Sequence, residues 1–235
     1  MDLPIPARAL AIGAHADDAE FGCAGTLAKW AKGGAEVHLC VLTDGSKGTW
    51  DADADIGALV ASRRDEQRAA AATLGVAAVH FLDLVDGELE NGRDERDSVC
   101  QLIRRLRPEI VLGHDPWKRY RLHPDHREAG FLTIAAIVAA RDPHFFPGRG
   151  TPHRPDRLLL FEPEVVDHTE DIAGYLDAKV AALLCHQTQW RNTMGIDPAD
   201  PDTSPFAARV RAEAEAAGAA SGIALGEAFK LVEPL

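Results

Sequence analysis

The sequence predicts an α/β fold in which buried strands alternate with helices around a mostly parallel sheet. Short apolar runs such as 9–14 close in glycine or polar residues, which is typical of strands covered on both faces. Segments of helical length separate these runs, as the crossover connections between parallel strands require. Glycine or proline stops end several of those segments. Together these observations indicate a Rossmann-like three-layer α/β/α sandwich.

The expected elements alternate along the chain as this fold requires. In order they are strand 9–14, helix 21–32, strand 36–42, helix 56–74, strand 78–82, helix 98–107, strand 110–113, helix 127–140, strand 157–161, helices 172–184 and 206–217, and strand 226–232. The first helix has Phe21, Leu27 and Trp30 among alanines, and later helices end at Gly75 and Pro108. The strands are short apolar runs between polar or glycine-containing loops. Residues 141–155, rich in Pro, Gly and His, are expected to be irregular.

The length of 235 residues suits one sizeable α/β domain. No internal repeat or low-complexity linker divides the chain, so we expect a single domain over residues 1–235. The part from about residue 151 is less regular. We expect it to pack on the active-site end of the sheet.

Charge and cysteine usage argue against several classes of protein. A net charge of −12 opposes binding to nucleic-acid phosphates or to an anionic membrane surface. No apolar run approaches the roughly 20 residues that span a bilayer, and the N-terminus lacks the pattern of a secretory signal. The four scattered cysteines indicate neither a disulfide framework nor a thiolate zinc site. We therefore expect a cytoplasmic protein without a nucleic-acid partner or membrane insertion; the sequence permits a homo-oligomer without predicting one.

Two clusters of histidine and aspartate follow predicted strands. His15, Asp17 and Asp18 come directly after strand 9–14, and HDPWKRYRLHPDH occupies 114–126 after strand 110–113. Both loops leave the carboxyl edge of a parallel sheet, where ligands bind in such folds. Two imidazoles and one carboxylate with an open position for water form the pattern of catalytic zinc. Zinc lowers the pKa of that water to about 7, and a neighbouring carboxylate acting as general base adds roughly 10²–10⁴-fold in rate.

These motifs resemble those of the PIG-L/LmbE-like zinc-dependent N-acetylglucosamine deacetylases, which include the GlcNAc-phosphatidylinositol, mycothiol-pathway and bacillithiol-pathway enzymes. GAHADDAEFGCAGTLA is similar to the family signature AHPDDxE, and HPDH follows the fourth strand. LTDGSKGT, SRRDEQRAAAATLGV and LDAKVAALLCHQTQ also resemble family segments, so the likeness extends to about Gln189. Ala16 departs from the family pattern, which has proline there. That change should loosen the turn without removing a ligand.

The resemblance implies a metal centre and its catalytic groups. It implies His15, Asp18 and His126 as ligands of Zn²⁺, with another divalent metal as an alternative. It implies Asp17 as the general base. It implies His123 as the histidine that stabilises the oxyanion and helps to protonate the leaving amine.

The resemblance also implies supporting and substrate-binding residues. Asp125 corresponds to the carboxylate that orients a catalytic histidine. Arg63 corresponds to a helical arginine that reaches the site and contacts substrate, with a shift by one residue to Arg64 left open. His186 corresponds to a recurring family histidine, which we assign to substrate binding.

Four aromatic side chains are candidates for stacking on a sugar ring. They are Trp50, Trp117, Tyr120 and Trp190. Trp117 and Tyr120 lie in the loop that contains HPDH, so we assign substrate binding to these two. Packing in the core or at its rim is the alternative for each.

Simpler structural roles are alternatives for several residues. Asp18 can cap the helix that follows it, and HPDH can start a helix with its proline in the first turn. His114 can make a structural hydrogen bond in place of a bond to the metal. Arg63 can pair with Asp65 or Glu66 on its own helix.

The expected function is that of a metal-dependent hydrolase that removes an N-acetyl group from an N-acetylglucosamine-type conjugate, through zinc-bound water and the Asp17 base. One alternative is a metal-dependent hydratase that acts on an unsaturated carboxylic acid. Another is a sugar-binding module without catalysis. The sequence leaves open the aglycone, the native metal and the oligomeric state.

Overall fold

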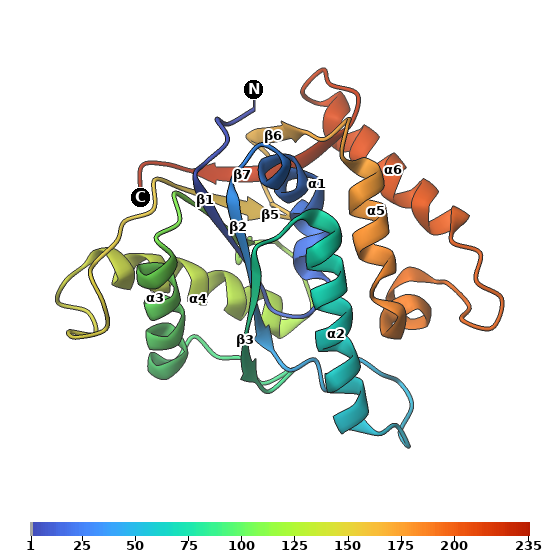
Figure 1. The fold of residues 1–235 in the computed structure, drawn as a ribbon, viewed down its shortest axis with the longest axis horizontal. Coiled ribbons are helices and arrows are strands. Elements are labelled where there is room, and N and C mark those ends of the chain that lie inside the picture. Colours follow the sequence, from blue (N-terminus) through green and yellow to red (C-terminus); the bar gives the residue numbers. More distant parts are fainter. Residues whose placement is uncertain (1) are drawn as a thin grey trace.

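Seven strands form one mixed sheet in the computed structural model, which describes residues 2–235 (Figure 1). The strands are β1 (Arg8–Gly13), β2 (Glu36–Thr43), β3 (Ala78–Leu84), β4 (Ile110–His114), β5 (Arg157–Phe161), β6 (His168–Asp171) and β7 (Gly226–Val232). Their order across the sheet is β3-β2-β1-β4-β5-β7-β6. The first five strands pair in parallel, and β7 runs antiparallel to both β5 and β6. The mostly parallel sheet expected from the sequence is confirmed.

Helices cover both faces of this sheet (Figure 1). They are α1 (Asp18–Lys32), α2 (Ile56–Leu74), α3 (Arg93–Leu106), α4 (Pro124–Arg141), α5 (Leu176–Leu184) and α6 (Ser204–Ala219), with short turns η1 (Gln187–Gln189) and η2 (Trp190–Met194). Leu10 and Ile12 of β1 pack with α3 and α4, whereas Ala9 and Ala11 pack with α1 and α2. This alternation gives the three-layer α/β/α sandwich. None of the described helices has the length and hydrophobicity needed to cross a bilayer.

The strand order reverses at the centre of the sheet. The chain proceeds from β1 outward to β3, and then returns to place β4 on the other side of β1. In open α/β sheets, ligands bind at this point of reversal, outside the carboxyl ends of the strands. The loops after β1 and β4 therefore meet where a site is expected.

Two element boundaries differ from expectation in ways that affect the site. Helix α4 begins three residues earlier than predicted, with Pro124 in its first turn, where the missing amide donor of proline is tolerated. Asp125 and His126 consequently project from a helix and not from a loop. Helix α1 also begins three residues earlier than predicted, at Asp18. The Asp18 carboxylate, an expected metal ligand, therefore lies on the first residue of the helix.

One strand and one interruption were not anticipated. Strand β6 has the sequence HTED, which is short and polar and gives no apolar signal. Helix α1 breaks at Cys23, whose φ of −154° is not helical. The amides of Gly25 and Thr26 beyond the break donate to the Glu227 carboxylate of β7 at 2.9 and 2.8 Å. Glu227 therefore takes the place of an N-cap side chain for the second half of α1.

Replacement of Glu227 by alanine should destabilise the fold by about 3–5 kcal/mol, because it leaves buried Lys179, whose ammonium lies 2.7 Å from Glu227, without its carboxylate. Urea unfolding followed by circular dichroism measures this loss. Glu213→Ala, at an exposed position of α6, is the matched control and should change stability by about 0.5 kcal/mol or less. Equal unfolding midpoints for the two variants would contradict this account of α1.

Candidate functional site

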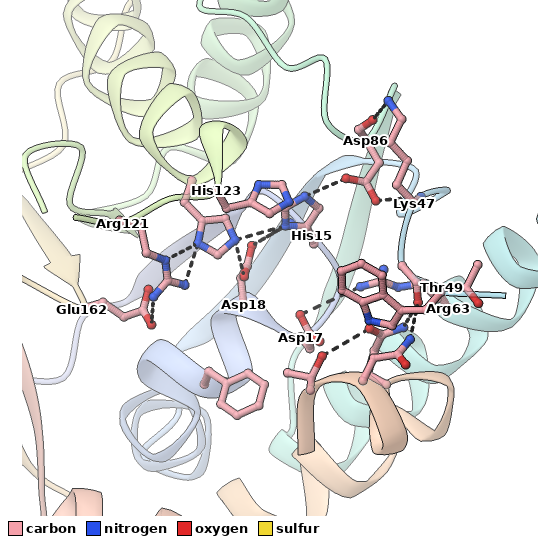
Figure 2. Close-up of a pocket in the computed structure, with 17 residues that line it drawn as sticks. His15, Asp17, Asp18, Lys47, Thr49, Arg63, Asp86, Arg121, His123 and Glu162 are labelled. Atoms are coloured by element: carbon pink, nitrogen blue, oxygen red, sulfur yellow. Dashed lines mark hydrogen bonds and ion pairs between the residues drawn. The ribbon is translucent and has the colours of Figure 1, made fainter. Parts of the chain in front are cut away.

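A cavity of about 490 Å³ opens at the carboxyl end of the sheet, where the loops after β1 and β4 meet (Figure 2). It is lined by His15, Asp17, Asp18, Phe21, Lys47, Gly48, Thr49, Trp50, Arg63, Asp86, Arg121, His123, His126, Glu162, Gln189, Asn192 and Thr193. These residues come from loops after several strands, from helices α1, α2 and α4, and from the η1–η2 segment. The cavity combines convergent histidines and carboxylates with an open mouth, as an enzyme site requires.

Three side chains converge at one point of the cavity wall. The Nδ1 atom of His15 lies 3.2 Å from Nε2 of His126. The two Asp18 oxygens lie 3.3 Å from His126 Nε2 and 3.5 Å from His15 Nδ1. Ligand atoms bound at about 2.0–2.1 Å to a tetrahedral ion lie about 3.3 Å from one another. The donor atoms therefore have the chemistry and the spacing that a divalent metal needs.

The surrounding side chains form overlapping groups of possible ligands. The sets with ligand atoms within 4.8 Å of one another are His15, His123 and His126; Asp18, His114 and His126; and His15, Asp86 and Asp125. The sequence-predicted set of His15, Asp18 and His126 draws on all three groups. We favour it because its donor atoms face one another across a shared point. Asp86 and Asp125 contact the other nitrogen of His15, His114 contacts Asp18, and His123 lies at the cavity mouth.

Two carboxylates lie behind His15. Its Nε2 atom is 3.1 Å from both Asp86 Oδ1 and Asp125 Oδ2. These acceptors favour a proton on Nε2, which leaves Nδ1 free to bind a metal. Burial opposes the charged imidazole, but hydrogen bonds with Asp125, Asp18 and Asp86 raise the pKa of His15 well above its ordinary value.

Asp125 and Asp86 are held by the turn after β3. The amides of Gly87 and Leu89 donate to Asp125 at 2.7 and 3.3 Å, and Asp125 is fully buried. We expected Asp125 to orient a catalytic histidine; the histidine that it contacts is the expected metal ligand His15. Sequence reasoning missed Asp86, although a carboxylate after the third strand at the same sheet edge was an available signal.

His114 supports the Asp18 carboxylate. Its Nε2 atom lies 3.1 Å from Asp18 Oδ2, which also accepts the backbone amide of His15 at 2.7 Å. Burial favours the neutral acid, yet His126 and His114 hold the pKa of Asp18 well below its ordinary value. Both roles left open for His114 stay predictions, since it contacts Asp18 and also belongs to one of the possible ligand sets.

Asp17 occupies a different side of the cavity from Asp18. In Figure 2 the Asp18 carboxylate points to His15, whereas Asp17 lies toward Arg63. Asp17 has φ of 97°, a left-handed conformation that is strained for any residue other than glycine. Burial raises the pKa of Asp17 to about 6, although the Arg63 guanidinium, 4.0 Å away, acts in the opposite direction. A carboxylate with such a pKa is suited to accept a proton near neutral pH.

Arg63 and Arg64 point in different directions. Arg63 donates to the carbonyls of Ala16 at 2.8 Å and Gly45 at 3.2 Å and lines the cavity. Arg64 instead pairs with Asp83 and lies over the ring of Phe81. The arginine that reaches the cavity is therefore Arg63.

His123 lies exposed at the cavity mouth. Its ring centroid is 4.6 Å from that of His15 and 5.1 Å from that of His126. Burial of part of the ring and the neighbouring His15 lower the pKa of His123 below its ordinary value. A neutral imidazole there can donate one hydrogen bond into the cavity.

Arg121 and Glu162 form a second feature that the sequence did not reveal. Arg121 donates to Nδ1 of His126 from Nε at 2.9 Å and pairs with Glu162 at 2.8 Å. Burial lowers the pKa of His126 to about 3, and Arg121 acts in the same direction. A neutral imidazole that binds a metal through Nε2 carries its proton on Nδ1. Arg121 must therefore turn away from Nδ1 when His126 binds an ion in that form.

Three residues assigned to substrate binding do not line the cavity. Trp117 packs edge-to-face on Phe131 with ring centroids 5.8 Å apart, and Tyr120 is 87% exposed outside the cavity. Their loop turns outward and returns to the cavity only at Arg121. His186 is fully buried and cannot touch a ligand. Among the described residues, two aromatic side chains other than histidine line the cavity, Phe21 and Trp50, and Trp50 is 88% exposed.

Comparison with known proteins finds a matching family model and similar deacetylases. The sequence matches the family model described as PIG-L, GlcNAc-PI de-N-acetylase, over residues 10–137. Diacetylchitobiose deacetylase of Thermococcus kodakarensis is 36% identical over 187 residues, 78% of this chain and 70% of that one. A 1D-myo-inositol 2-acetamido-2-deoxy-α-D-glucopyranoside deacetylase of Rhodococcus erythropolis is 30% identical over 239 residues, 77% and 81% of the two chains.

Two further matches bear on fold and on reaction type. The structure of N,N'-diacetylchitobiose deacetylase from Pyrococcus horikoshii superposes with a TM-score of 0.86 at 29% identity, covering 97% of this chain and 84% of that one. A 4-oxalmesaconate hydratase of Pseudomonas putida is 29% identical over 188 residues, 75% of this chain and 72% of that one.

Asp86→Asn and Asp125→Asn should each weaken metal binding by about 10- to 100-fold, because each removes a carboxylate that fixes the proton on His15 Nε2. Competition with a chromogenic chelator measures the affinity of the purified protein for Zn²⁺. Asp83→Asn, an exposed carboxylate paired with Arg64, is the control and should leave affinity unchanged. Equal affinities for all three variants would remove the orienting role.

Proposed function

Because the chain belongs to the PIG-L family of GlcNAc-PI de-N-acetylases, we propose that its cavity hydrolyses the acetamide of an N-acetylglucosamine-type amino sugar. Membership of this family makes the chain a hydrolase that removes N-acetyl groups. The observation that carries the proposal is the convergence of His15, Asp18 and His126 beside Asp17. This arrangement supports the proposal, because side chains of the types that bind metals and a buried carboxylate surround one open cavity.

The donor set of His15 Nδ1, Asp18 and His126 Nε2 suits Zn²⁺, which takes nitrogen and oxygen ligands in tetrahedral sites. When bound, the ion supplies Lewis-acid polarisation of the amide carbonyl and acidifies water. We assign the three residues to this role because the two histidine nitrogens lie 3.2 Å apart, with Asp18 Oδ1 3.3 Å from His126 Nε2 and Asp18 Oδ2 3.5 Å from His15 Nδ1.

Asp17 and His123 have different roles in the proposed reaction. Asp17 takes a proton from the attacking water, whose oxygen forms the new bond to the acetyl carbon. His123 donates a hydrogen bond to the oxygen that becomes negatively charged, stabilisation that is often the largest contribution in acyl transfer. The C–N bond then breaks, and the amine leaves with the proton that Asp17 took from water, while neutral His123 keeps its proton and contributes only a hydrogen bond. The products are acetate and the free amino sugar.

Substrate contacts come from the cavity rim. Trp50 presents an unpacked indole, which can stack on the apolar face of a sugar ring. Gly48, two residues earlier, accepts hydrogen bonds from Gln189 at 3.0 Å and Asn192 at 3.2 Å. These amides connect the loop after β2 to the η1–η2 segment, so the loop that presents Trp50 is tied to the cavity wall.

The alternative is a hydratase reaction, because one of the similar proteins is a 4-oxalmesaconate hydratase. The two reactions differ in products: hydration of an unsaturated acid consumes an absorbing double bond and releases no acetate. Measurement of acetate and free amine from N-acetylglucosamine conjugates therefore separates them. A sugar-binding module without catalysis would release neither product.

Asp17→Asn should retain metal and lose about 10²–10⁴-fold in turnover, because the amide cannot accept the proton of water. Asp18→Ala and His126→Ala should lose metal as well as activity. The measurement is acetate release from N-acetylglucosamine and diacetylchitobiose, with metal content determined on the same samples. Full turnover in Asp17→Asn would remove the base assignment.

Trp50→Ala should raise KM for the amino-sugar substrate by about 2- to 10-fold, in keeping with the 0.5–1.5 kcal/mol of an aromatic contact, with kcat preserved. Trp117→Ala is the matched control, since its ring lies outside the cavity. A rise in KM in Trp117→Ala alone would reverse the assignment of the stacking residue.

A further inference from the structure

Three buried polar side chains lie behind Asp17 and do not line the cavity. Glu20 of α1, Gln67 of α2 and His186 after α5 are 0%, 1% and 0% exposed. Burial of such groups is unfavourable unless they find partners, so their contacts show what they hold. None of the roles proposed for the cavity residues explains them.

Gln67 joins Asp17 to Glu20. Its Oε1 accepts the backbone amide of Asp17 at 3.2 Å, and its Nε2 donates to Glu20 Oε1 at 2.6 Å. A carboxylate only accepts hydrogen bonds, so Glu20 fixes the carboxamide with its nitrogen inward and its oxygen toward Asp17. The other Glu20 oxygen lies 3.7 Å from Nε2 of His186, beyond hydrogen-bond distance, and the two form an ion pair only when that imidazole is protonated.

These contacts form a variant of the capping box, the hydrogen-bond pattern that satisfies backbone amides at the start of a helix. Asp17 is the N-cap residue and Glu20 the third residue of the helix, the two positions of a capping box. In a capping box the glutamate accepts the N-cap amide directly. Here Gln67 stands between the two groups, and the Asp17 side chain makes no capping hydrogen bond. The Asp17 carboxylate is therefore not engaged in capping and can serve the cavity.

The backbone of Asp17, whose amide donates to Gln67, is strained. Its φ of 97° and ψ of −24° lie in the left-handed region, which costs about 1–3 kcal/mol for a residue with a side chain. A strained conformation persists only when its surroundings impose it. The hydrogen bond from the Asp17 amide to Gln67 is such a contact, and it comes from a residue 50 positions away.

We propose that Gln67, with its carboxamide oriented by Glu20, is a positioning residue that holds Asp17 in its left-handed conformation and its carboxylate in the cavity. The inference rests on the proposed function, in which Asp17 is the base. It also gives buried His186 a place, as the neighbour of Glu20 and not as a residue that lines the cavity.

The first test is Gln67→Leu, which removes the acceptor and the donor with little change in volume. We expect kcat for acetate release to fall by about 10- to 100-fold, with KM and zinc affinity unchanged, because only the base is displaced. Gln101→Leu is the matched control: Gln101 is part-buried on α3, bonds Asp97 and lies outside the cavity. A fall in zinc affinity equal to the fall in kcat would overturn the inference.

The second test exchanges the two groups. Gln67→Glu places a carboxylate against Glu20 and should lose activity as Gln67→Leu does. Addition of Glu20→Gln supplies a carboxamide at position 20 that can donate to the new carboxylate at position 67, which can still accept the Asp17 amide. The double variant should therefore recover to within about 3-fold of the original kcat. A general loss of packing would not be repaired by this exchange. Failure of the double variant to exceed Gln67→Glu would contradict the positioning role.

A crystal structure of Gln67→Leu separates this inference from the proposed function. Departure of Asp17 from the left-handed region supports the positioning role, and retention of φ near 97° overturns it. Both outcomes hold whatever the substrate is. Absence of acetate release by the original protein would count against the proposed function alone.

Discussion

The parallel pairing of β1 with β4 is the constraint on which the site depends. Ala9, Leu10 and Ala11 pair with Ile110, Val111 and Leu112, so both strands end at the same height. The loop that contains His15 then meets the loop and helix that contain His126, 111 residues further along the chain. A shift of one residue in this register would turn every side chain of the strand to the other face. Such a shift would place Leu10 and Ile12 where Ala9 and Ala11 pack against α1 and α2, so close packing on the two faces opposes it.

The site concentrates histidines and carboxylates in a buried volume, and their mutual contacts make that burial tolerable. Asp86 and Asp125 face one nitrogen of His15, while His114 faces Asp18. Each pairing satisfies a group that burial would otherwise penalise. In the proposed metal site, the same pairings would fix which nitrogen binds the ion, and binding would be coupled to the loss of protons. Structural stability and the proposed metal affinity would then depend on the same side chains.

Helix α1 departs from ordinary helix geometry at two places in its N-terminal half. It begins at a strained N-cap, Asp17, and breaks at Cys23, and each departure is supported from a distant element. Gln67 of α2 accepts the Asp17 amide, and Glu227 of β7 caps the segment after the break. Departures of this kind are expected near functional residues, because the site needs a geometry that the isolated helix would not adopt.

The strand–helix alternation and much of the site chemistry were open to prediction because short-range signals determine them. Helix α2 and strands β5 and β7 have the expected bounds, since a glycine stop or an apolar run is visible locally. The spacing of His15, Asp17 and Asp18 also lies within one turn. Strand β6 escaped prediction because four polar residues pair with β7 only in the folded sheet.

The sequence alone determined which residues carry side chains capable of metal binding and acid–base chemistry, and which strands bring them to the edge of the sheet. Only the tertiary structure decided their partners: Asp86 behind His15, Arg121 on His126, Gln67 on Asp17, and Trp50 in place of Trp117 at the rim. The physical reason is that local spacing fixes side chains within one turn or strand, whereas a hydrogen bond between distant segments exists only after the sheet has set their relative positions.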